Sequence, residues 1–451
     1  MSYKKSIYNV VVDELENGRK LIYNTYSGIF GIMDKKTQNI YENIEEFSSE
    51  SGLDEEALQN IHIMGRSGYI VNTEKDELSS IKLERAKGRL NPSILKLVIG
   101  STMDCNMCCP YCFEDNRDIV MSEETQEQLY TFVKASFDRD ANIKTLEVVW
   151  YGGEPLMQKE IIYSLSKRFI DLCAEKGKHY RAGIITNATL LDAETAKRLV
   201  EFKVDRAQIT VDGMKEIHNK RRILVSGEDS FEIIMKNIDD CKEMISIHVR
   251  VNVDKENIDN MDELVNYFYS EKGWKSNPRF YLAPVEGLPV ESGGGSVDES
   301  ECLTGEEFAE AKIKSIKAGY AVDRSIVDYA VFPRRRIVFC HGEAAHHYII
   351  DPEGFYYNCY KQIGIKEQST GHISKPFVCS TEYGKWLSVD VSEKCEECEY
   401  LPMCMGGCGL HRINGNDPVC FYASYAYKDF LKLAYQDYLH QKSKSESIAG
   451  N

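Results

Sequence analysis

The densest group of reactive side chains lies in residues 105–113, CNMCCPYCF, where four cysteines fall within eight residues. Thiolates bind zinc and iron–sulfur clusters, so this many thiols on one short segment could serve as metal ligands. The chain has 15 cysteines, and this odd count argues against a closed set of disulfides. We therefore expect metal or iron–sulfur ligation at this segment.

Three of these cysteines, Cys105, Cys109 and Cys112, have the spacing C-x3-C-x2-C. A cubane cluster has four irons, so three thiolate ligands leave one iron open to an outside molecule. No triplet that contains Cys108 has this spacing, and we expect Cys108 not to be a ligand. Zinc held by the four close thiols is the alternative.

Together with Phe113, this spacing resembles the motif of the radical S-adenosylmethionine (SAM) enzymes, in which an aromatic residue follows the last cysteine. The resemblance implies a 4Fe–4S cluster whose open iron is chelated by the amino and carboxylate groups of SAM. It also implies that an electron from flavodoxin or ferredoxin reaches this cluster and cleaves SAM to a 5′-deoxyadenosyl radical. In such enzymes the cofactor carries the chemistry and the protein orients it.

A second motif, WYGGEP, contains Gly152, Gly153 and Glu154. Adjacent glycines let the backbone come close to a ligand, and a carboxylate can accept hydrogen bonds from an ammonium group. The segment resembles the GGEP motif of the same family, which binds the methionyl amino group of SAM. A tight turn without a ligand is the alternative.

Two further segments could complete a SAM pocket. Asn187 follows an apolar segment and resembles the polar turn that contacts the SAM ribose in the family. Gln208, Thr210 and Asp212 alternate along the next segment, which places them on one face of a strand, and Thr210 is a candidate contact. The alternative is that these residues fill the interior of the barrel and lead into an Asp-Gly turn without contacting SAM. We assign no role to the basic segment 218–222, HNKRR.

A second cysteine array begins at position 340 and resembles the SPASM extension of radical SAM peptide-modifying enzymes, with Gly354 at the expected place. The resemblance implies two auxiliary 4Fe–4S clusters, hence three clusters in all. The implied ligands are Cys340, Cys359 and Cys408 for auxiliary cluster I, and Cys395, Cys398, Cys404 and Cys420 for auxiliary cluster II. The fourth site of cluster I is filled by Cys302, with Cys379 less favoured, or is open to a substrate thiolate. A zinc ribbon is the alternative.

The elements that would position these residues begin at residue 94, where six apolar strand candidates alternate with amphipathic segments. This alternation predicts an α/β fold with a parallel sheet, two units short of a complete eight-fold barrel. Active sites lie at the carboxyl ends of such strands. The strand candidates are residues 94–101, 146–153, 180–187, 207–213, 247–254 and 279–285.

Residues 1–90 contain no cysteine and show short strands, then helical segments near 37–48 and 54–65. We expect a winged-helix-like module here, joined by a helix over 74–90 to a partial (β/α)6 radical SAM barrel over 91–320. We expect a SPASM domain over 321–451 to follow the barrel, and a loop over 286–301. The first module resembles those that bind precursor peptides, which implies that a leader sequence adds a strand to an exposed sheet edge. A structural cap is the alternative.

The composition limits the partners. The formal net charge is −16 and the sequence pI is about 5.3, which disfavours nucleic acid or an anionic membrane as a partner. We find no signal peptide at the start and no apolar run of about 18 residues, so we expect a cytoplasmic protein.

The resemblance of the two cysteine motifs implies a radical SAM/SPASM peptide maturase of the thioether-forming sactipeptide or ranthipeptide type. Such an enzyme would abstract hydrogen from a ribosomally made peptide and join a cysteine thiol to a carbon. A carbon–carbon crosslink or formylglycine formation are alternatives within the same family. A protein that uses its cysteines only to bind iron–sulfur clusters or zinc is the alternative from another class.

Overall fold

The computed structural model describes residues 2–46, 54–274, 277–287, 297–322, 334–415 and 419–449. The chain forms two compact units. The barrel unit comprises Leu90–Asp328 and His341–Ser388, and the terminal unit comprises Met1–Arg89, Tyr329–Cys340 and Val389–Asn451. Each unit combines stretches that are distant in sequence. The predicted domain limits 1–90, 91–320 and 321–451 divide the chain into consecutive stretches, and they stay a prediction. Part of the predicted loop over 286–301 lies outside the described residues.

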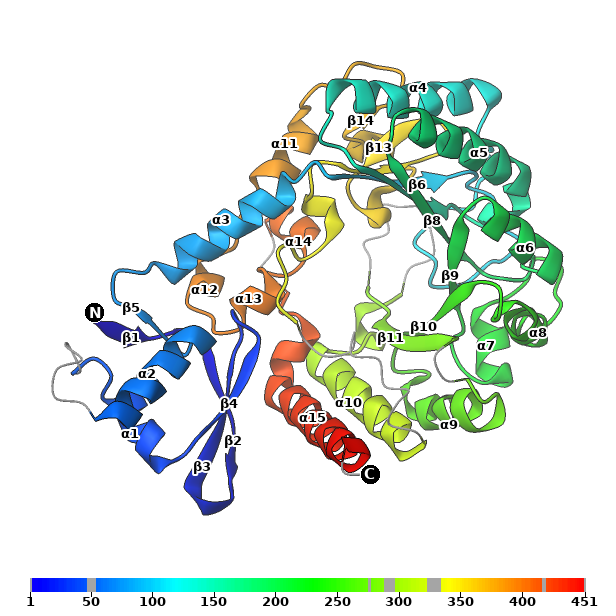
Figure 1. Ribbon diagram of the computed structural model, residues 1–451. Coiled ribbons are helices and arrows are strands. Elements are labelled where there is room, and N and C mark those ends of the chain that lie inside the picture. Colours follow the sequence, from blue (N-terminus) through cyan, green and yellow to red (C-terminus); the bar gives the residue numbers. More distant parts are fainter. Residues whose placement is uncertain are drawn as a thin grey trace. The chain divides into compact units, whose positions relative to one another are not determined.

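The barrel unit is built on parallel strands that neighbour one another in sequence order (Figure 1). This order confirms the α/β fold and the parallel sheet that the alternating pattern predicted. β7 is buried almost throughout, as expected for a central parallel strand covered on both faces. The strands are β6 (Ile94–Gly100), β7 (Thr145–Tyr151), β8 (His179–Thr186), β9 (Val204–Thr210), β10 (Ser246–Val253) and β11 (Arg279–Pro284).

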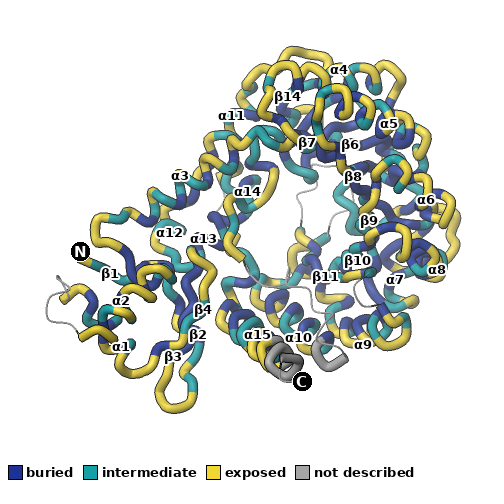
Figure 2. Tube along the Cα trace, viewed as in Figure 1, coloured by how far each residue is buried: buried dark blue, intermediate teal, exposed yellow. Residues whose placement is uncertain are grey.

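Helices cover the outer side of this sheet (Figure 1). They present buried apolar residues to the strands and exposed residues to solvent (Figure 2). Side-chain caps fix two of their starts: Ser122 accepts from the Thr125 amide at 3.1 Å and Asp192 from the Thr195 amide at 2.7 Å. The helices are α4 (Glu123–Arg139), α5 (Lys159–Glu175), α6 (Ala193–Glu201), α7 (Lys215–Arg221), α8 (Phe231–Cys241), α9 (Met261–Asn266) and α10 (Gly305–Val322).

β10 shows how the sheet places polar groups on its other face. Its residues alternate between buried apolar positions, such as Val249 and Val251, and partly buried polar ones, such as Arg250 and Asn252. Successive side chains of a strand point to opposite faces, so the polar set lies away from the outer helices. Beyond β6 the sheet continues through β12 (His347–Ile350), parallel to β6, and antiparallel β13 (Phe355–Tyr357) and β14 (Gly371–His372). Helix α11 (Thr381–Ser388) ends the unit.

The terminal unit begins with β1 (Tyr3–Lys5) and an antiparallel sheet of three strands in the order β2-β3-β4. Two helices follow near the predicted positions, and their residues Ile40 and Ile61 pack with Ile22 of β3 in one buried cluster. The predicted connecting helix is present as α3. The bounds are β2 (Asn9–Leu15), β3 (Arg19–Asn24), β4 (Ile29–Met33), α1 (Lys35–Glu42), α2 (Glu55–Ser67), β5 (Ile70–Asn72) and α3 (Glu77–Arg89).

The C-terminal part of this unit shares a core with its N-terminal part. Tyr8 and Ile81 lie in one buried cluster with Leu401 and Met405. The buried Arg85 of α3 donates to the Val389 carbonyl at 2.9 Å. The helices here are α12 (Glu393–Glu396), α13 (Leu401–Cys404), α14 (Gly409–Ile413) and α15 (Tyr427–Ala449). Within the described part of the chain, no helix has the length and apolar character needed to span a membrane.

Candidate active site

The cysteine loop, residues 105–112, follows β6 in the barrel unit, where the parallel sheet predicts a site. Cys105, Cys109 and Cys112 are partly buried, and the Cys112 amide donates to the Cys109 carbonyl at 3.1 Å. Cys108 differs from them because it is exposed, with its sulfur 3.7 Å from the Ile223 carbonyl oxygen. The expectation that Cys108 is not a ligand stays a prediction.

The thiols of the predicted triplet lie in a common electrostatic environment. Burial raises the pKa of the Cys105 and Cys112 thiols to about 12, and the neighbouring Cys109 adds to both shifts. The Met107 amide donates to the Cys105 sulfur at 3.4 Å, and the Arg222 guanidinium opposes the rise at each thiol. Three thiols on one loop, with an N–H donor to sulfur and a cation beside them, fit an iron–sulfur group.

Gly152 and Gly153 hold the next loop against the residues that lead into the cysteine loop. The Gly153 amide donates to the Thr102 carbonyl at 3.1 Å, and the Glu154 amide to the Asp104 carbonyl at 2.9 Å. A Cβ on Gly152 would lie 2.2 Å from the Thr102 oxygen, and one on Gly153 would lie 2.3 Å from the Asp104 oxygen. The glycines are therefore required by contact between the two loops, and their contact with SAM stays a prediction.

Glu154 is fully buried and cross-links the ends of β7 and β8. One carboxylate oxygen accepts from the Leu156 amide at 3.0 Å and the Thr186 hydroxyl at 2.7 Å, and the other accepts from the Asn187 amide at 2.7 Å. Burial raises the pKa of this carboxyl despite these hydrogen bonds. A buried carboxylate fixed in this way could receive a cation such as an ammonium group.

Asn187 lies directly beside the cysteine loop. The side-chain nitrogen of Asn187, Nδ2, donates to the Asn106 side-chain oxygen at 2.7 Å and lies 4.0 Å from the Cys105 sulfur. Thr189 joins the same group, since its hydroxyl donates to the Asn187 oxygen at 2.7 Å. The structure thus brings Asn187 to the first cysteine of the predicted triplet.

The polar residues Gln208 and Thr210 of β9, and Asp212 just after it, have different partners. Gln208 accepts from the Tyr281 hydroxyl at 2.7 Å, and Thr210 is partly buried beside Arg250 of β10. Asp212 is fully buried and accepts from the Asn252 amide at 3.0 Å. Of the three, Asp212 is the one that contacts the cysteine loop, through Tyr111.

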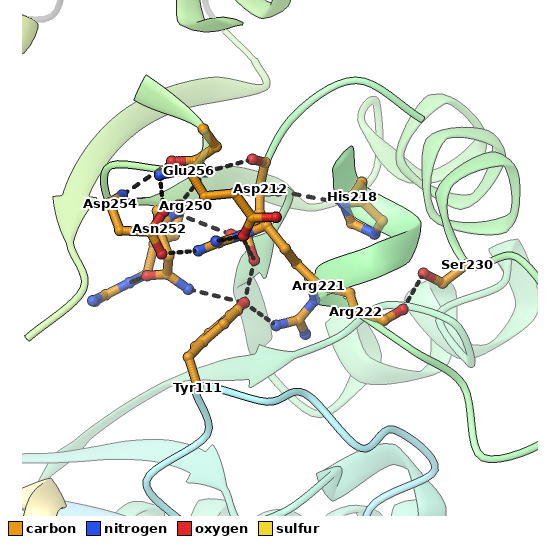
Figure 3. Close-up of polar contacts among 11 residues, drawn as sticks. Tyr111, Asp212, His218, Arg221, Arg222, Ser230, Arg250, Asn252, Asp254 and Glu256 are labelled. Carbon is orange, nitrogen blue, oxygen red and sulfur yellow. Dashed lines mark hydrogen bonds and ion pairs between the residues drawn. The ribbon is translucent and has the colours of Figure 1, made fainter. Parts of the chain in front are cut away.

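A buried polar network around Tyr111 is the main feature that sequence reasoning missed (Figure 3). The Tyr111 hydroxyl donates to Asp212 and accepts from Arg222 at 3.1 Å. Arg221 pairs with Asp254 at 2.8 Å and Glu256 at 2.9 Å. The available signal was the basic pair Arg221–Arg222 after a polar strand end, in a chain with a net charge of −16.

Phe113 and Glu114 complete the loop. Phe113 packs against the buried cluster that contains Met103 and Tyr151, so its predicted contact with SAM stays a prediction. Glu114 has a buried carboxylate oxygen without a hydrogen-bond partner, and burial raises the pKa of this carboxyl to about 7.

The terminal unit contains a second group of neighbouring thiols. Burial raises the pKa of Cys398 and Cys404, and in both cases Cys395 and Cys420 add to the rise. Backbone amides donate to these sulfurs, from Tyr400 to Cys398 and from Phe421 and Gly406 to Cys404. Cys395 and Cys420 thus lie within electrostatic range of Cys398 and Cys404. The assignment of these four cysteines to auxiliary cluster II, which the resemblance implied, stays a prediction.

The remaining candidate ligands are more dispersed. Cys340 and Cys408 belong to the terminal unit and Cys359 to the barrel unit, so their predicted grouping stays a prediction. Cys302 is buried, with its sulfur 3.7 Å from the Asp298 carbonyl oxygen, and Cys379 is exposed. In the ranges that the structure describes, no three His, Cys, Asp or Glu side chains form a group that could hold a metal ion.

Comparison with known proteins identifies the domain that carries the cysteine loop. Residues 99–268 match the radical SAM superfamily. A cysteine-type anaerobic sulfatase-maturating enzyme of Clostridium novyi is 26% identical over 387 residues, which cover 76% of this chain and 97% of that protein. An Fe-coproporphyrin III synthase of Methanosarcina barkeri is 28% identical over 218 residues, and the match spans 48% of this chain and 49% of that relative.

Two solved structures share the fold. anSMEcpe with bound AdoMet and Cp18Cys peptide superposes with a TM-score of 0.61 at 18% identity, covering 78% of this chain and 99% of that one. SuiB of Streptococcus suis bound to its precursor peptide SuiA superposes with a TM-score of 0.52 at 15% identity, covering 94% of this chain and 99% of that one.

Proposed function

We propose that this chain, a radical SAM enzyme by its domain at residues 99–268, modifies a ribosomally made precursor peptide and forms a cysteine thioether crosslink in it. The observation that carries the proposal is that the cysteine loop, the Gly152–Glu154 loop and Asn187 lie together in the barrel unit. Three partly buried thiols, a fixed carboxylate and a polar turn meet there at the carboxyl ends of neighbouring strands.

The roles of the individual residues follow from their contacts. A 4Fe–4S cluster with SAM would supply a one-electron reduction and a carbon radical able to abstract hydrogen. Cys105, Cys109 and Cys112 would hold the cluster. Glu154 would receive the SAM amino group, and Asn187 would lie beside the ribose. Because Glu154 already has three hydrogen-bond donors, it would orient SAM without moving.

A peptide substrate is supported by the named relatives, which include a sulfatase-maturating enzyme and a structure solved with a precursor peptide. The thioether rests on the second cysteine array. Burial raises the pKa of the thiol of Cys302, the favoured fourth ligand of auxiliary cluster I, and the charges of Asp254, Glu299 and Glu286 add to the rise. This environment favours the alternative in which that iron stays open to a substrate thiolate.

The leader of the precursor would bind the terminal unit. β4 is at the edge of the order β2-β3-β4, and Ile29 and Ile32 on it are 40% and 45% exposed. An added peptide strand could pair with this edge. A cavity of about 620 Å³ lies in the same unit, and its lining, which contains four basic residues and one acidic residue, Glu77, would suit acidic leader residues. The basic residues that line it are His62, Arg66, Lys75 and Arg335.

Formylglycine formation is the second candidate, because the Clostridium novyi relative is matched over almost its whole length. The two outcomes differ in the fate of sulfur. A thioether keeps the cysteine sulfur in the peptide and removes two hydrogens per crosslink, whereas conversion of cysteine to formylglycine removes the sulfur.

The test is anaerobic reconstitution with iron and sulfide, followed by dithionite, SAM and a candidate precursor peptide encoded next to the gene. We expect 5′-deoxyadenosine, and a peptide that has lost two hydrogens per link and kept its sulfur. Peptide that has lost sulfur would favour formylglycine formation. Absence of 5′-deoxyadenosine from protein that carries iron at the cysteine loop would reject the enzyme.

A further inference from the structure

Arg250 of β10 is a partly buried cation on the inner face of the barrel sheet, the face that is turned away from the outer helices. Its neighbours in the strand, Val249 and Val251, are fully buried, and successive side chains of a strand point to opposite faces. Arg250 lies three residues before Val253, the last residue of β10. It is therefore close to the carboxyl end of the strand, where such sheets carry their binding groups.

The guanidinium of Arg250 differs from those of other arginines in the barrel unit. Arg168 pairs with Glu127 at 2.6 Å. Arg198 pairs with Glu160 at 3.7 Å. Among the described residues, no carboxylate forms an ion pair with Arg250. An arginine side chain stays charged in proteins, so this site holds a positive charge without a partner, in a chain with a net charge of −16.

The buried carboxylates of the polar network in Figure 3 are engaged by other cations. Asp254 pairs with Arg221 at 2.8 Å. Burial raises the pKa of Asp212, and the charges of Arg222 and Arg221 oppose the rise. These carboxylates therefore have counter-charges of their own, and the charge of Arg250 is available to an anion from outside the protein.

Hydrogen bonds hold Arg250 beside the cysteine loop. Its Nε donates to Oδ1 of Asn252 at 2.7 Å, and Nδ2 of Asn252 donates to the Tyr111 hydroxyl at 3.4 Å. Figure 3 shows Asn252 between Arg250 and Tyr111. A guanidinium has five N–H donors, so donors on the terminal nitrogens remain for a planar anion, which they can bind through two parallel hydrogen bonds.

Neutral polar side chains flank Arg250 on both neighbouring strands. Its register partners are Thr210 of β9 and Tyr281 of β11, and both are partly buried. The Tyr281 hydroxyl donates to Oε1 of Gln208 at 2.7 Å. Burial raises the pKa of Tyr281, and the Arg250 guanidinium opposes the rise. One fixed cation between neutral hydrogen-bonding groups is an arrangement that suits a single anionic group of a ligand.

We propose that Arg250, flanked by Thr210 and Tyr281, binds a carboxylate of the precursor peptide on the inner face of the sheet and holds the modified segment beside the cysteine loop. The inference rests on the proposed function, which assigns a peptide substrate to this enzyme. A peptide carries carboxylates in its Asp and Glu side chains and at its C-terminus. The planar guanidinium matches the shape of this group, which makes Arg250 a residue that selects the peptide.

The test uses the reconstituted full-length protein under anaerobic conditions, with the candidate precursor peptide encoded next to the gene as the probe. In Arg250→Gln we expect kcat/KM for peptide modification to fall at least about tenfold, because charge-assisted hydrogen bonds to the peptide are lost. The Kd for SAM and the formation of 5′-deoxyadenosine without peptide should not change. Arg250→Lys should recover part of the loss, because it keeps the charge.

Changes in the peptide identify the carboxylate. One peptide carries Asn and Gln in place of the Asp and Glu residues of its modified segment, and another is amidated at its C-terminus. With wild-type protein, one of the two should lose about the same factor in kcat/KM as Arg250→Gln loses, and it should lose nothing further when combined with that variant. Full activity of wild-type protein on both peptides would overturn the proposal, even if Arg250→Gln fails to fold.

Arg181→Gln is the matched control. Arg181 lies in β8 of the same sheet and already pairs with Glu147, so its loss removes a cation that has a counter-charge. We expect kcat/KM to fall less than about threefold. Equal losses in Arg181→Gln and Arg250→Gln would assign the effect to the net charge of the barrel and overturn the proposal. A weaker Kd for SAM in Arg250→Gln would place the residue at the cofactor and overturn it as well.

Failure of the proposed function gives a different result. Wild-type protein would then produce no 5′-deoxyadenosine and leave the peptide unmodified, and both proposals would be rejected. Wild-type protein that modifies the peptide, together with an unchanged kcat/KM in Arg250→Gln, would contradict only the role of Arg250.

Discussion

The two cysteine groups of the chain differ in what surrounds them. The cysteine loop of the barrel unit offers three thiols, and buried charged residues lie beside it, among them Glu154, Asp212 and Arg222. The group around Cys398 and Cys404 in the terminal unit offers four thiols beside an apolar core. A site that must bind and break a charged molecule needs fixed charges, whereas a closed metal site needs ligands and packing.

The largest effect is expected from the loss of a predicted cluster ligand in the cysteine loop. We predict that Cys105→Ala abolishes SAM cleavage and lowers iron by about four atoms out of about 12 per chain, as expected for loss of one of three clusters. The matched control is Cys108→Ala, which removes the exposed thiol of the same loop. This variant should keep both SAM cleavage and the full iron content. Anaerobic iron analysis and chromatography of 5′-deoxyadenosine measure the result. Equal losses in the two variants would contradict the assignment of ligands.

The second prediction concerns the terminal unit. Cys404→Ala should also lower iron by about four atoms per chain. It should leave 5′-deoxyadenosine formation without peptide largely intact, because the cysteine loop belongs to the other unit. Cys379→Ala, which removes an exposed thiol, should change neither quantity. Full iron content in Cys404→Ala would remove auxiliary cluster II from the proposal.

A smaller effect is expected from the contact between the two loops. In Gly152→Ala the new Cβ would lie 2.2 Å from the Thr102 oxygen at a φ of +129°. The loop before Cys105 must then move, and we expect the free energy of unfolding to fall by about 1 to 3 kcal/mol and SAM cleavage to fall about tenfold. Chemical denaturation and product analysis measure both changes.

Gly177→Ala is the control for this variant, because Gly177 also has a positive φ, +63°, but faces open space. It isolates backbone strain from the clash with the cysteine loop. We expect it to lower stability slightly and to leave SAM cleavage unchanged. The same loss of cleavage in both variants would show that the contact with Thr102 is not what matters.

The sequence predicted the parallel strands and the triplet of cysteines because both depend on local pattern. Apolar segments at regular spacing mark buried strands, and the cysteines of a cluster motif lie in one loop. The roles of Tyr111 and Arg222 could not be predicted in this way, because their contact joins residues 111 positions apart. The packing function of Gly152 was also hidden, since its partner Thr102 lies on a different strand end.

The C-terminal cysteines also show what a sequence motif cannot reveal. The resemblance to the SPASM extension implied that Cys395, Cys398, Cys404 and Cys420 hold one cluster, and this ligand set stays a prediction. The charges of Cys395 and Cys420 act on both Cys398 and Cys404. Spacing did not reveal that they lie in the same compact unit as the first 89 residues. That arrangement depends on apolar contacts such as Ile81 with Leu401, which a motif does not encode.

The smallest expected effect concerns Glu114, beside the last cysteine of the loop. Burial raises the pKa of its carboxyl from 4.5 to about 7, so the folded state holds a proton that the unfolded state has released between these values. The free energy of unfolding of the metal-free protein should therefore fall as pH rises from about 4.5 to 7, by at most about 3 kcal/mol from this group. Glu114→Gln should flatten the profile in that range, whereas Glu123→Gln at the exposed start of α4 should not. Denaturation at successive pH values measures these profiles, and identical profiles for Glu114→Gln and wild type would contradict the raised pKa of the Glu114 carboxyl.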